Sequence, residues 1–342
     1  MTPRWSAFLS SRGATLAEGV VRRFGDPAGE LDAAATASVL ADLSHLALLG
    51  VSGPDAESFL QGQLSCDVAG LAADGATLGS YCSAKGRMLA SFVLWREPDG
   101  FALALSRTLA GPIAQRLRLF VLRAKVAIAD RSDECVLLGA AGAAAESALR
   151  AAAGALPQQA GRVARRDGAT VVRSARDRYL IAAAPERAPT LWDALSERLR
   201  PVGTPCWEWL DIVDGLPLVT ARIQDELVPQ MANLELIGGV SFEKGCYPGQ
   251  EVVARTQYRG KPKRRMFLAR IEGAAPAPGD PLYSEDLGDQ ASGAIVNAAP
   301  APGGGYDVLA VVHASSAADS TVRLGSPAGA PLRFRPLPYA VP

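Results

Sequence analysis

A single cysteine inside a tight turn is the clearest reactive group in this sequence. The stretch EKGCYPGQE, residues 243–251, places Cys246 two residues after Lys244, and seven basic residues follow between Arg255 and Arg270 with no acidic residue among them. Cations beside a thiol lower its pKa and raise its reactivity. The other interpretation is a buried cysteine that packs as a small apolar side chain, and the residues alone leave both open.

The residues that follow Cys246 predict a turn that exposes the thiol. In Tyr247-Pro248-Gly249-Gln250 the proline fixes its own φ and the glycine accepts a positive φ, as a type II turn requires. Gly245, on the other side of the cysteine, allows a close backbone approach. We therefore expect the thiol at the rim of a pocket.

Basic and aromatic residues near the turn suit an anionic ligand that carries a flat ring. Arg255 and Arg259 can pair with carboxylates or phosphates through two hydrogen bonds, and Lys244 adds a point charge. A ring system could stack on Trp207, although such side chains also fill cores. The pattern favours a small-molecule site.

The composition argues against binding to large anionic surfaces. The chain of 342 residues carries 35 Lys plus Arg against 35 Asp plus Glu, so the molecule as a whole does not attract nucleic acid or anionic membrane. An RNA-binding module built on residues 255–270 is thus a weaker hypothesis, and we do not expect direct nucleic-acid binding. With no secretory signal and no apolar run of about 18 residues, we expect a cytoplasmic protein that does not engage the membrane.

Cysteine and histidine usage argues against a resident metal centre. The five cysteines are too far apart for a C-x-x-C pair, and the chain has two histidines. We therefore expect no stably bound metal and no disulfide framework.

The apolar patterns predict an α+β protein with two units that contain mixed sheets. In the first unit, about residues 38–135, we expect a helix at 34–44, strands at 45–53, 76–86, 87–97 and 100–107, and a helix from about Pro112. In the second, about residues 136–260, we expect strands at 135–140, 169–174 and 178–183 and helices ending near 155 and 200.

The last part of the chain predicts a small closed β-barrel. Short apolar runs separated by Gly and Pro fill residues 261–342, whereas 31–260 form the α+β region and 1–30 an N-terminal extension. Small ligands commonly bind at domain joints. We therefore expect a cleft at this joint, lined by Lys244, Tyr247, Arg255 and Arg259.

The sequence resembles the YgfZ family over most of its length. KGCYPGQEVVARTQYRG, residues 244–260, resembles the family's K-G-C-Y-x-G-Q-E signature. FLQGQLSCDV, AKGRM, DGLPLV, VPQMANLELIGG and the terminal PLPY match the family pattern in the same order. The resemblance implies the folate-binding α+β fold of the glycine cleavage aminomethyltransferase (GcvT), with a C-terminal β-barrel.

The resemblance also implies a function. It indicates a folate-binding accessory protein that supports synthesis or repair of iron–sulfur clusters, with Cys246 as its functional thiol. The ligand would be tetrahydrofolate or a related folate. The partners would be assembly proteins and iron–sulfur client enzymes, including those that thiomethylate tRNA. The implied folate contacts are Trp207, Lys244, Tyr247, Arg255, Arg259, Lys85, Asn233, Gln250, Glu251 and His45.

Two positions depart from the transferase pattern. Leu89 and Ala90 stand where the transferase carries its catalytic acid, and Val213 stands where a glutamate holds the pteridine. The sequence therefore leaves enzymatic turnover undecided. Tetrahydrofolate-dependent one-carbon transfer is the alternative function, and a glycine-cleavage assay separates the two.

Overall fold

The computed structural model describes residues 1–175, 177–258, 260, 262–273 and 275–342, and the chain forms two compact units that alternate along the sequence. Unit 1 comprises Met1–Phe59, Ala69–Thr77 and Val93–Trp207, and unit 2 comprises Leu60–Val68, Leu78–Phe92 and Glu208–Pro342. The domain boundaries expected near residues 30, 135 and 260 are a different division and stay predictions.

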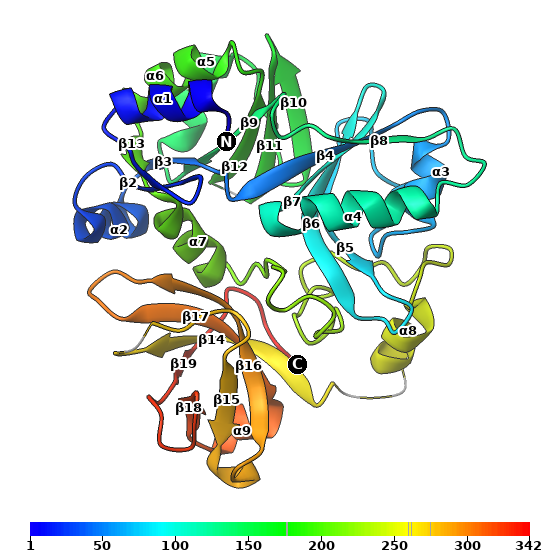
Figure 1. The fold of residues 1–342 in the computed structure, drawn as a ribbon, viewed down its shortest axis with the longest axis vertical. Helices are drawn as coiled ribbons and strands as arrows, with labels where there is room; N and C mark the ends of the chain where they lie inside the picture. Colours follow the sequence, from blue (N-terminus) through cyan, green and yellow to red (C-terminus); the bar gives the residue numbers. More distant parts are fainter. Residues whose placement is uncertain (176, 259, 261, 274) are drawn as a thin grey trace. The chain divides into compact units, whose positions relative to one another are not determined.

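A six-stranded mixed sheet forms one core of unit 1 (Figure 1). All its neighbouring strands are antiparallel except β13, which pairs parallel with β3. In spatial order the strands are β10 (Arg162–Arg166), β11 (Ala169–Ala175), β12 (Arg178–Ala183), β9 (Val136–Ala141), β3 (Val39–Asp42) and β13 (Arg200–Val202).

Three helices contribute apolar side chains to the core of this sheet. Trp5 and Leu9 come from α1 (Pro3–Ser11), Leu149 comes from α5 (Ala145–Ala153), and Trp192 comes from α6 (Ala188–Ser196). Gly154 ends α5 with φ at 72°, a left-handed conformation that costs glycine little. Burial of these large side chains supplies most of the stabilisation of this layer.

The expectation of a helix at residues 34–44 is wrong. The preceding helix α2 (Pro27–Thr36) ends early, and Val39–Asp42 form strand β3, with all four residues buried. Residues of β3 pair with β9 on one side and with β13 on the other. A short, fully buried apolar run is compatible with a helix or a strand in sequence. Pairing with β9 and β13, about 100 and 160 residues further along the chain, makes this run a strand.

The second sheet has five strands, and four of them lie at the apolar runs expected at 45–53, 76–86, 87–97 and 100–107. Their spatial order is β5 (Ala76–Cys82), β6 (Met88–Glu97), β7 (Gly100–Ser106), β4 (Leu46–Ser52) and β8 (Ala127–Asp130). The chain passes from one unit to the other within β5 and within β6. Helix α4 (Arg107–Leu119) begins before Pro112 and buries Ile113 and Leu117 against β4, β7 and β8.

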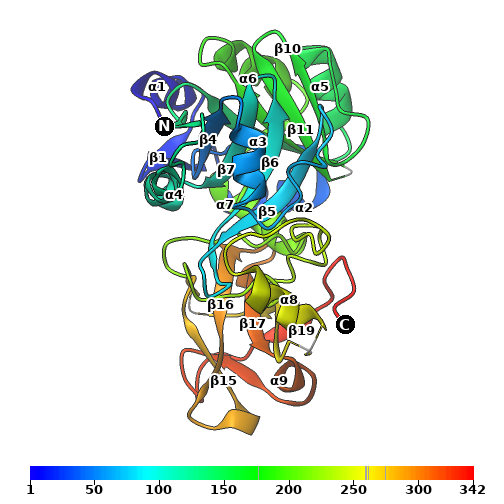
Figure 2. The same cartoon turned by 90° about the vertical axis from the view of Figure 1, so that its right-hand side faces the viewer.

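The C-terminal strands of unit 2 form a curled antiparallel half-barrel (Figure 2). Their order is β18 (Val322–Leu324), β15 (Pro281–Ser284), β16 (Ala291–Pro300), β17 (Tyr306–His313), β14 (Arg264–Ile271) and β19 (Arg333–Arg335). The expected β-barrel is present, but not as the closed one predicted: within the described part of the chain, β18 and β19 end the sheet without a ladder between them. Arg323 of β18 forms an isolated bridge with Pro331, and Leu332 N donates to Val322 O at 2.8 Å, so the segment that leads into β19 lies against β18.

The remaining elements are short. They are β1 (Thr15–Ala17), β2 (Val20–Arg23), α3 (Ala56–Gln61), α7 (Thr204–Val213), α8 (Gln250–Tyr258), the 3₁₀ turn η1 (Glu285–Leu287) and α9 (Ala314–Asp319). Across the residues that the structure describes, no helix has the length and apolar character needed to cross a membrane.

Candidate functional site

The turn at Cys246 has the predicted geometry. Gln250 N donates to Tyr247 O at 3.1 Å, and Gly249 has φ at 79°, as the third position of a type II turn requires. Gly245 has open space around it. Cys246 lies exposed between Gly245 and the buried Tyr247.

A glycine pair fixes this turn to the AKGRM loop of unit 2. A Cβ on Gly249 would lie 2.4 Å from Ser83 O and 2.5 Å from Gly86 Cα, and one on Gly86 would lie 3.1 Å from Gly249 O. Both contacts are with backbone, which cannot move aside cheaply. Lys85, exposed beside Gly86, is therefore held near the turn.

Lys244 anchors the base of the turn. Its Nζ donates to three backbone carbonyls, Gln61 O at 2.6 Å, Leu64 O at 2.6 Å and Cys66 O at 3.0 Å. Burial lowers the pKa of its ammonium group. All three ammonium hydrogens thus form hydrogen bonds within the protein. These bonds join Lys244 to the backbone at and just after the end of α3.

Tyr247 packs beside Lys244 with its hydroxyl buried. The Lys244 ammonium lies 5.3 Å from the ring centroid, an arrangement that favours a cation–π attraction. The hydroxyl has no hydrogen-bond partner among the described residues, and burial raises its pKa, with Cys82 and Cys66 adding to the shift. Buried hydroxyls without a partner are rare in folded proteins.

The other four cysteines lie in different surroundings from Cys246. Cys66, Cys82 and Cys206 are buried and Cys135 is partly buried. Burial raises the pKa of Cys66, Cys135 and Cys206 to about 12 and that of Cys82 to about 11. At neutral pH these groups are protonated thiols with little access to reagents. Only one of the five cysteines is therefore presented to solvent.

Helix α8 borders an open groove that is rich in basic side chains. The groove, of about 580 Å³, is lined by Val228, Met231, Arg255, Thr256, Gly260, Pro262, Lys263, Arg264 and His313. Arg255 pairs with Glu251 at 2.7 Å on the exposed face of α8, next to Gln250 at the start of the helix. Burial lowers the pKa of His313, Arg264 and Lys263 lower it further, and Asp286 raises it. Lys244 and Tyr247 lie in the base of the turn instead, and Arg259 lies outside the described residues.

Asn233 belongs to a buried polar cluster in unit 2. It is fully buried with φ at 55°, and its Nδ2 donates to Met266 O at 2.8 Å, while its Oδ1 has no partner among the described residues. Nearby, Arg265 forms a buried ion pair with Glu235 and donates to Gln230 O at 2.8 Å. The side-chain oxygen Gln230 Oε1 and the carboxylate oxygen Glu235 Oε2 also lack partners. Sequence reasoning missed this cluster, although the VPQMANLELIGG segment contains it.

Two of the predicted folate contacts lie in unit 1. Trp207 is buried, with the Arg178 guanidinium 4.1 Å from its ring centroid, and a Cβ on Gly139 would lie 2.4 Å from its ring. His45 follows β3, and burial lowers its pKa to about 4, with Arg107 adding to the shift. Both of its ring nitrogens are buried without a partner among the described residues. His45 is therefore a neutral imidazole at physiological pH.

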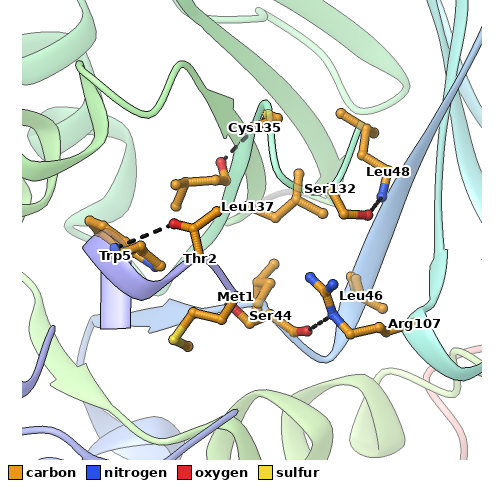
Figure 3. Close-up of a pocket in the computed structure, with 12 residues that line it drawn as sticks. Met1, Thr2, Trp5, Ser44, Leu46, Leu48, Arg107, Ser132, Cys135 and Leu137 are labelled. Atoms are coloured by element: carbon orange, nitrogen blue, oxygen red, sulfur yellow. Dashed lines mark hydrogen bonds between the residues drawn. The ribbon is translucent and has the colours of Figure 1, made fainter. Parts of the chain in front are cut away.

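Unit 1 also contains a small cavity beside Trp5, at the foot of α1 (Figure 3). It has room for about one water molecule, and Arg107 Nε crosses its edge to donate to Ser44 O at 2.5 Å. This cavity is too small for a folate. In the described ranges, no group of three or more His, Cys, Asp or Glu side chains could hold a metal ion.

Comparisons with known proteins agree on one family. The model of the GCVT N-terminal domain matches residues 22–243. A protein from Pectobacterium carotovorum named "tRNA-modifying protein YgfZ" is 34% identical over 316 residues, which cover 91% of this chain and 94% of the relative. Its namesake from Edwardsiella ictaluri is 40% identical, covering 85% of this chain and 89% of the relative.

The fold is shared with a solved transferase structure. The glycine cleavage system aminomethyltransferase T from Bartonella henselae superposes with a TM-score of 0.79 at 19% identity, covering 99% of this chain and 97% of that one. The GcvT-like fold expected from the sequence is thereby confirmed.

Proposed function

The chain belongs to the YgfZ family, and on that premise we propose a folate-binding accessory protein that supports synthesis or repair of iron–sulfur clusters in client enzymes. The observation that carries the proposal is the exposed Cys246, which directly precedes the buried Tyr247 in the turn. The relatives' name links them to tRNA modification. Enzymes that thiomethylate tRNA are therefore the first clients to test.

The surroundings of Cys246 suit a thiol that meets a partner. Its side chain is open to solvent, whereas Lys244 and Tyr247 fix the turn from below. Such a thiol can react with, or transiently bind, sulfur or iron of a client protein. A thiol placed for packing alone would lie with the other cysteines in the interior.

The residues of unit 2 also fit a folate. The basic groove beside α8 offers Arg255, Lys263 and Arg264 to the carboxylates of a glutamate tail. Arg255 is exposed and forms an ion pair with the exposed Glu251, so a ligand carboxylate can compete for it. The contacts of Trp207, His45, Asn233, Gln250, Glu251 and Lys85 with folate remain part of this proposal.

One-carbon transfer is the alternative that the fold allows. Leu89 and Ala90, which stand at the expected place of the transferase acid, are buried in β6. A buried apolar pair cannot move a proton during the transfer. We therefore expect no aminomethyltransferase activity in a glycine-cleavage assay, and turnover in that assay would favour the alternative.

The thiol is tested by complementation. In a strain that lacks the native copy, Cys246→Ser should fail to restore the activity of a tRNA-thiomethylating enzyme, whereas Cys135→Ser, a control at a partly buried cysteine, should restore it. Full activity with Cys246→Ser would contradict the proposed role.

The folate site is tested by calorimetric titration of the full chain with tetrahydrofolate. Arg255→Ala should weaken binding by about tenfold, because it removes one charge-assisted contact. Arg162→Ala is the matched control, since Arg162 also forms an exposed ion pair at 2.7 Å, with Asp74 in unit 1. Absence of heat at millimolar folate would contradict the proposed ligand.

A further inference from the structure

The end of helix α4 presents an unusual group of exposed apolar side chains. Leu119 is 70% exposed, Leu122 is 88% exposed and Phe120 is 43% exposed. Single exposed apolar residues are common on protein surfaces, whereas a cluster of large ones marks an interaction site. Together with the exposed Arg116, Arg123 and Lys125, these residues form what we call the α4 patch.

The chain at the α4 patch is held in place by hydrogen bonds. The Arg118 guanidinium donates to Ile128 O through Nε at 3.1 Å and through Nη2 at 2.7 Å. Lys125 N donates to Asp55 Oδ2 at 2.7 Å, and Ala124 N donates to Val121 O at 2.8 Å. The leucines are thus displayed by a structured turn and not by a loose end.

The backbone at Leu122 is strained without benefit to the fold. Its φ of 46° lies in the left-handed region, which bulky residues rarely adopt and which costs about 1 kcal/mol or more. The side chain gains little in return, because 88% of it faces solvent. Strain that burial does not offset is typical of residues kept for a contact with another molecule.

The segment that carries the patch is basic, and the Asp55 carboxylate lies beside it as the acceptor for Lys125 N. Residues 100–129 contain Arg107, Arg116, Arg118, Arg123 and Lys125 and no acidic residue, although the whole chain is neutral. The Arg116 guanidinium also lies 6.0 Å from the Phe120 ring centroid. Arginine beside aromatic side chains is enriched at protein interfaces. The complementary surface is therefore acidic at its rim and apolar at its centre.

We propose that the α4 patch is a docking surface for an acidic protein that offers a pocket to Leu119 and Leu122. This proposal rests on the proposed function in one respect, because it takes an iron–sulfur client enzyme as the partner. RNA bases stack on aromatic side chains, and the one aromatic residue of the patch, Phe120, already has the Arg116 guanidinium 6.0 Å from its ring centroid. A membrane-bound helix needs a free apolar face, whereas α4 buries Ile113 and Leu117 against its own sheet. A protein partner fits best.

Binding of the full chain to a purified radical iron–sulfur enzyme that thiomethylates tRNA tests the proposal. We expect binding that weakens as salt increases, and a dissociation constant about tenfold or more higher for Leu122→Asp, because a buried anchor is lost. Folding should be retained, since aspartate tolerates a positive φ and the site is exposed. Leu122→Met should bind like the wild type.

Charge reversal provides the second arm and its control. Arg123→Glu should weaken binding, whereas Arg198→Glu, a change at an exposed arginine outside the patch, should not. Unchanged binding with Leu122→Asp, or no binding by the wild type, would overturn the proposal. Retention of the wild type by phosphatidylglycerol vesicles or by tRNA, lost in Leu122→Asp, would overturn it in favour of that ligand. The folate affinity of Leu122→Asp, expected to be unchanged, separates this outcome from a failure of the proposed function.

Discussion

The base of the Cys246 turn, at Lys244 and Tyr247, and its tip, at Gly245 and Cys246, are neighbours in sequence but differ in burial and in hydrogen bonding. At the base, the Lys244 ammonium group donates hydrogen bonds to three backbone carbonyls and Tyr247 is buried. At the tip, Cys246 is exposed and Gly245 has open space around it. One short motif therefore separates the residues that stabilise the fold from the residue that carries the reactive thiol. Changes at the base should destabilise the protein, and changes at the tip should affect only its chemistry.

The largest effect is expected from Gly249→Ala. Its φ of 79° strains an alanine, and the new Cβ would lie 2.4 Å from Ser83 O. We expect a loss of at least about 2 kcal/mol in the free energy of unfolding, measured by urea denaturation. Gly245→Ala is the matched control at the tip and should change it by less than about 0.5 kcal/mol. Equal effects of the two changes would remove the distinction between base and tip.

A smaller loss is expected from Lys244→Met. The change keeps most of the side-chain volume but leaves the carbonyls of Gln61, Leu64 and Cys66 without their donor. We expect a loss of roughly 1–3 kcal/mol in the free energy of unfolding, because buried acceptors are left unpaired. Arg255→Met, which breaks an exposed pair with Glu251, should cost no more than about 0.5 kcal/mol. An unchanged free energy of unfolding in Lys244→Met would show that the three hydrogen bonds contribute nothing to stability.

The buried His45 should make the stability of the protein depend on pH, whereas the exposed Cys246 should not. Burial lowers the pKa of His45 from 6.5 to about 4, so between these values the unfolded chain binds a proton that the folded chain does not. Stability from this group is full above pH 6.5 and is lost as the pH falls towards 4. His45→Gln should flatten the pH dependence of the melting temperature across this window. The exposed tip residue Cys246, replaced by Ser, should leave that dependence unchanged.

The smallest effect on stability is expected from Cys246→Ser. The change is nearly isosteric and lies at an exposed position, so the free energy of unfolding should move by no more than about 0.5 kcal/mol. Chemical denaturation of the purified variant measures it. A loss of several kcal/mol would show that the thiol belongs to the base of the turn.

The sequence predicted the local features of this site well. Pro248 and Gly249 determine a type II turn through their own φ preferences, and β4, β6 and β7 follow from runs of apolar residues. These properties depend on neighbouring residues and can be read from a short window.

Features that depend on distant partners were not predictable in the same way. Val39–Asp42 became a strand because β9 and β13 supply its hydrogen bonds. The sequence suggests that Lys244 is a free cation, yet its ammonium group donates hydrogen bonds to carbonyls some 180 residues earlier in the chain. The unpaired oxygens of Gln230, Asn233 and Glu235 are likewise visible only once the chain is folded.

The rate at which each cysteine reacts with iodoacetamide shows most directly whether Cys246 is the accessible, reactive thiol. Native protein at neutral pH would be treated with a limiting amount of the reagent, and each thiol would be quantified by peptide mass spectrometry. Reactivity follows thiolate fraction and access, so Cys246 should be alkylated at least about tenfold faster than Cys66, Cys82, Cys135 or Cys206. Alkylation of any of these four at the rate of Cys246 in folded protein would contradict the account.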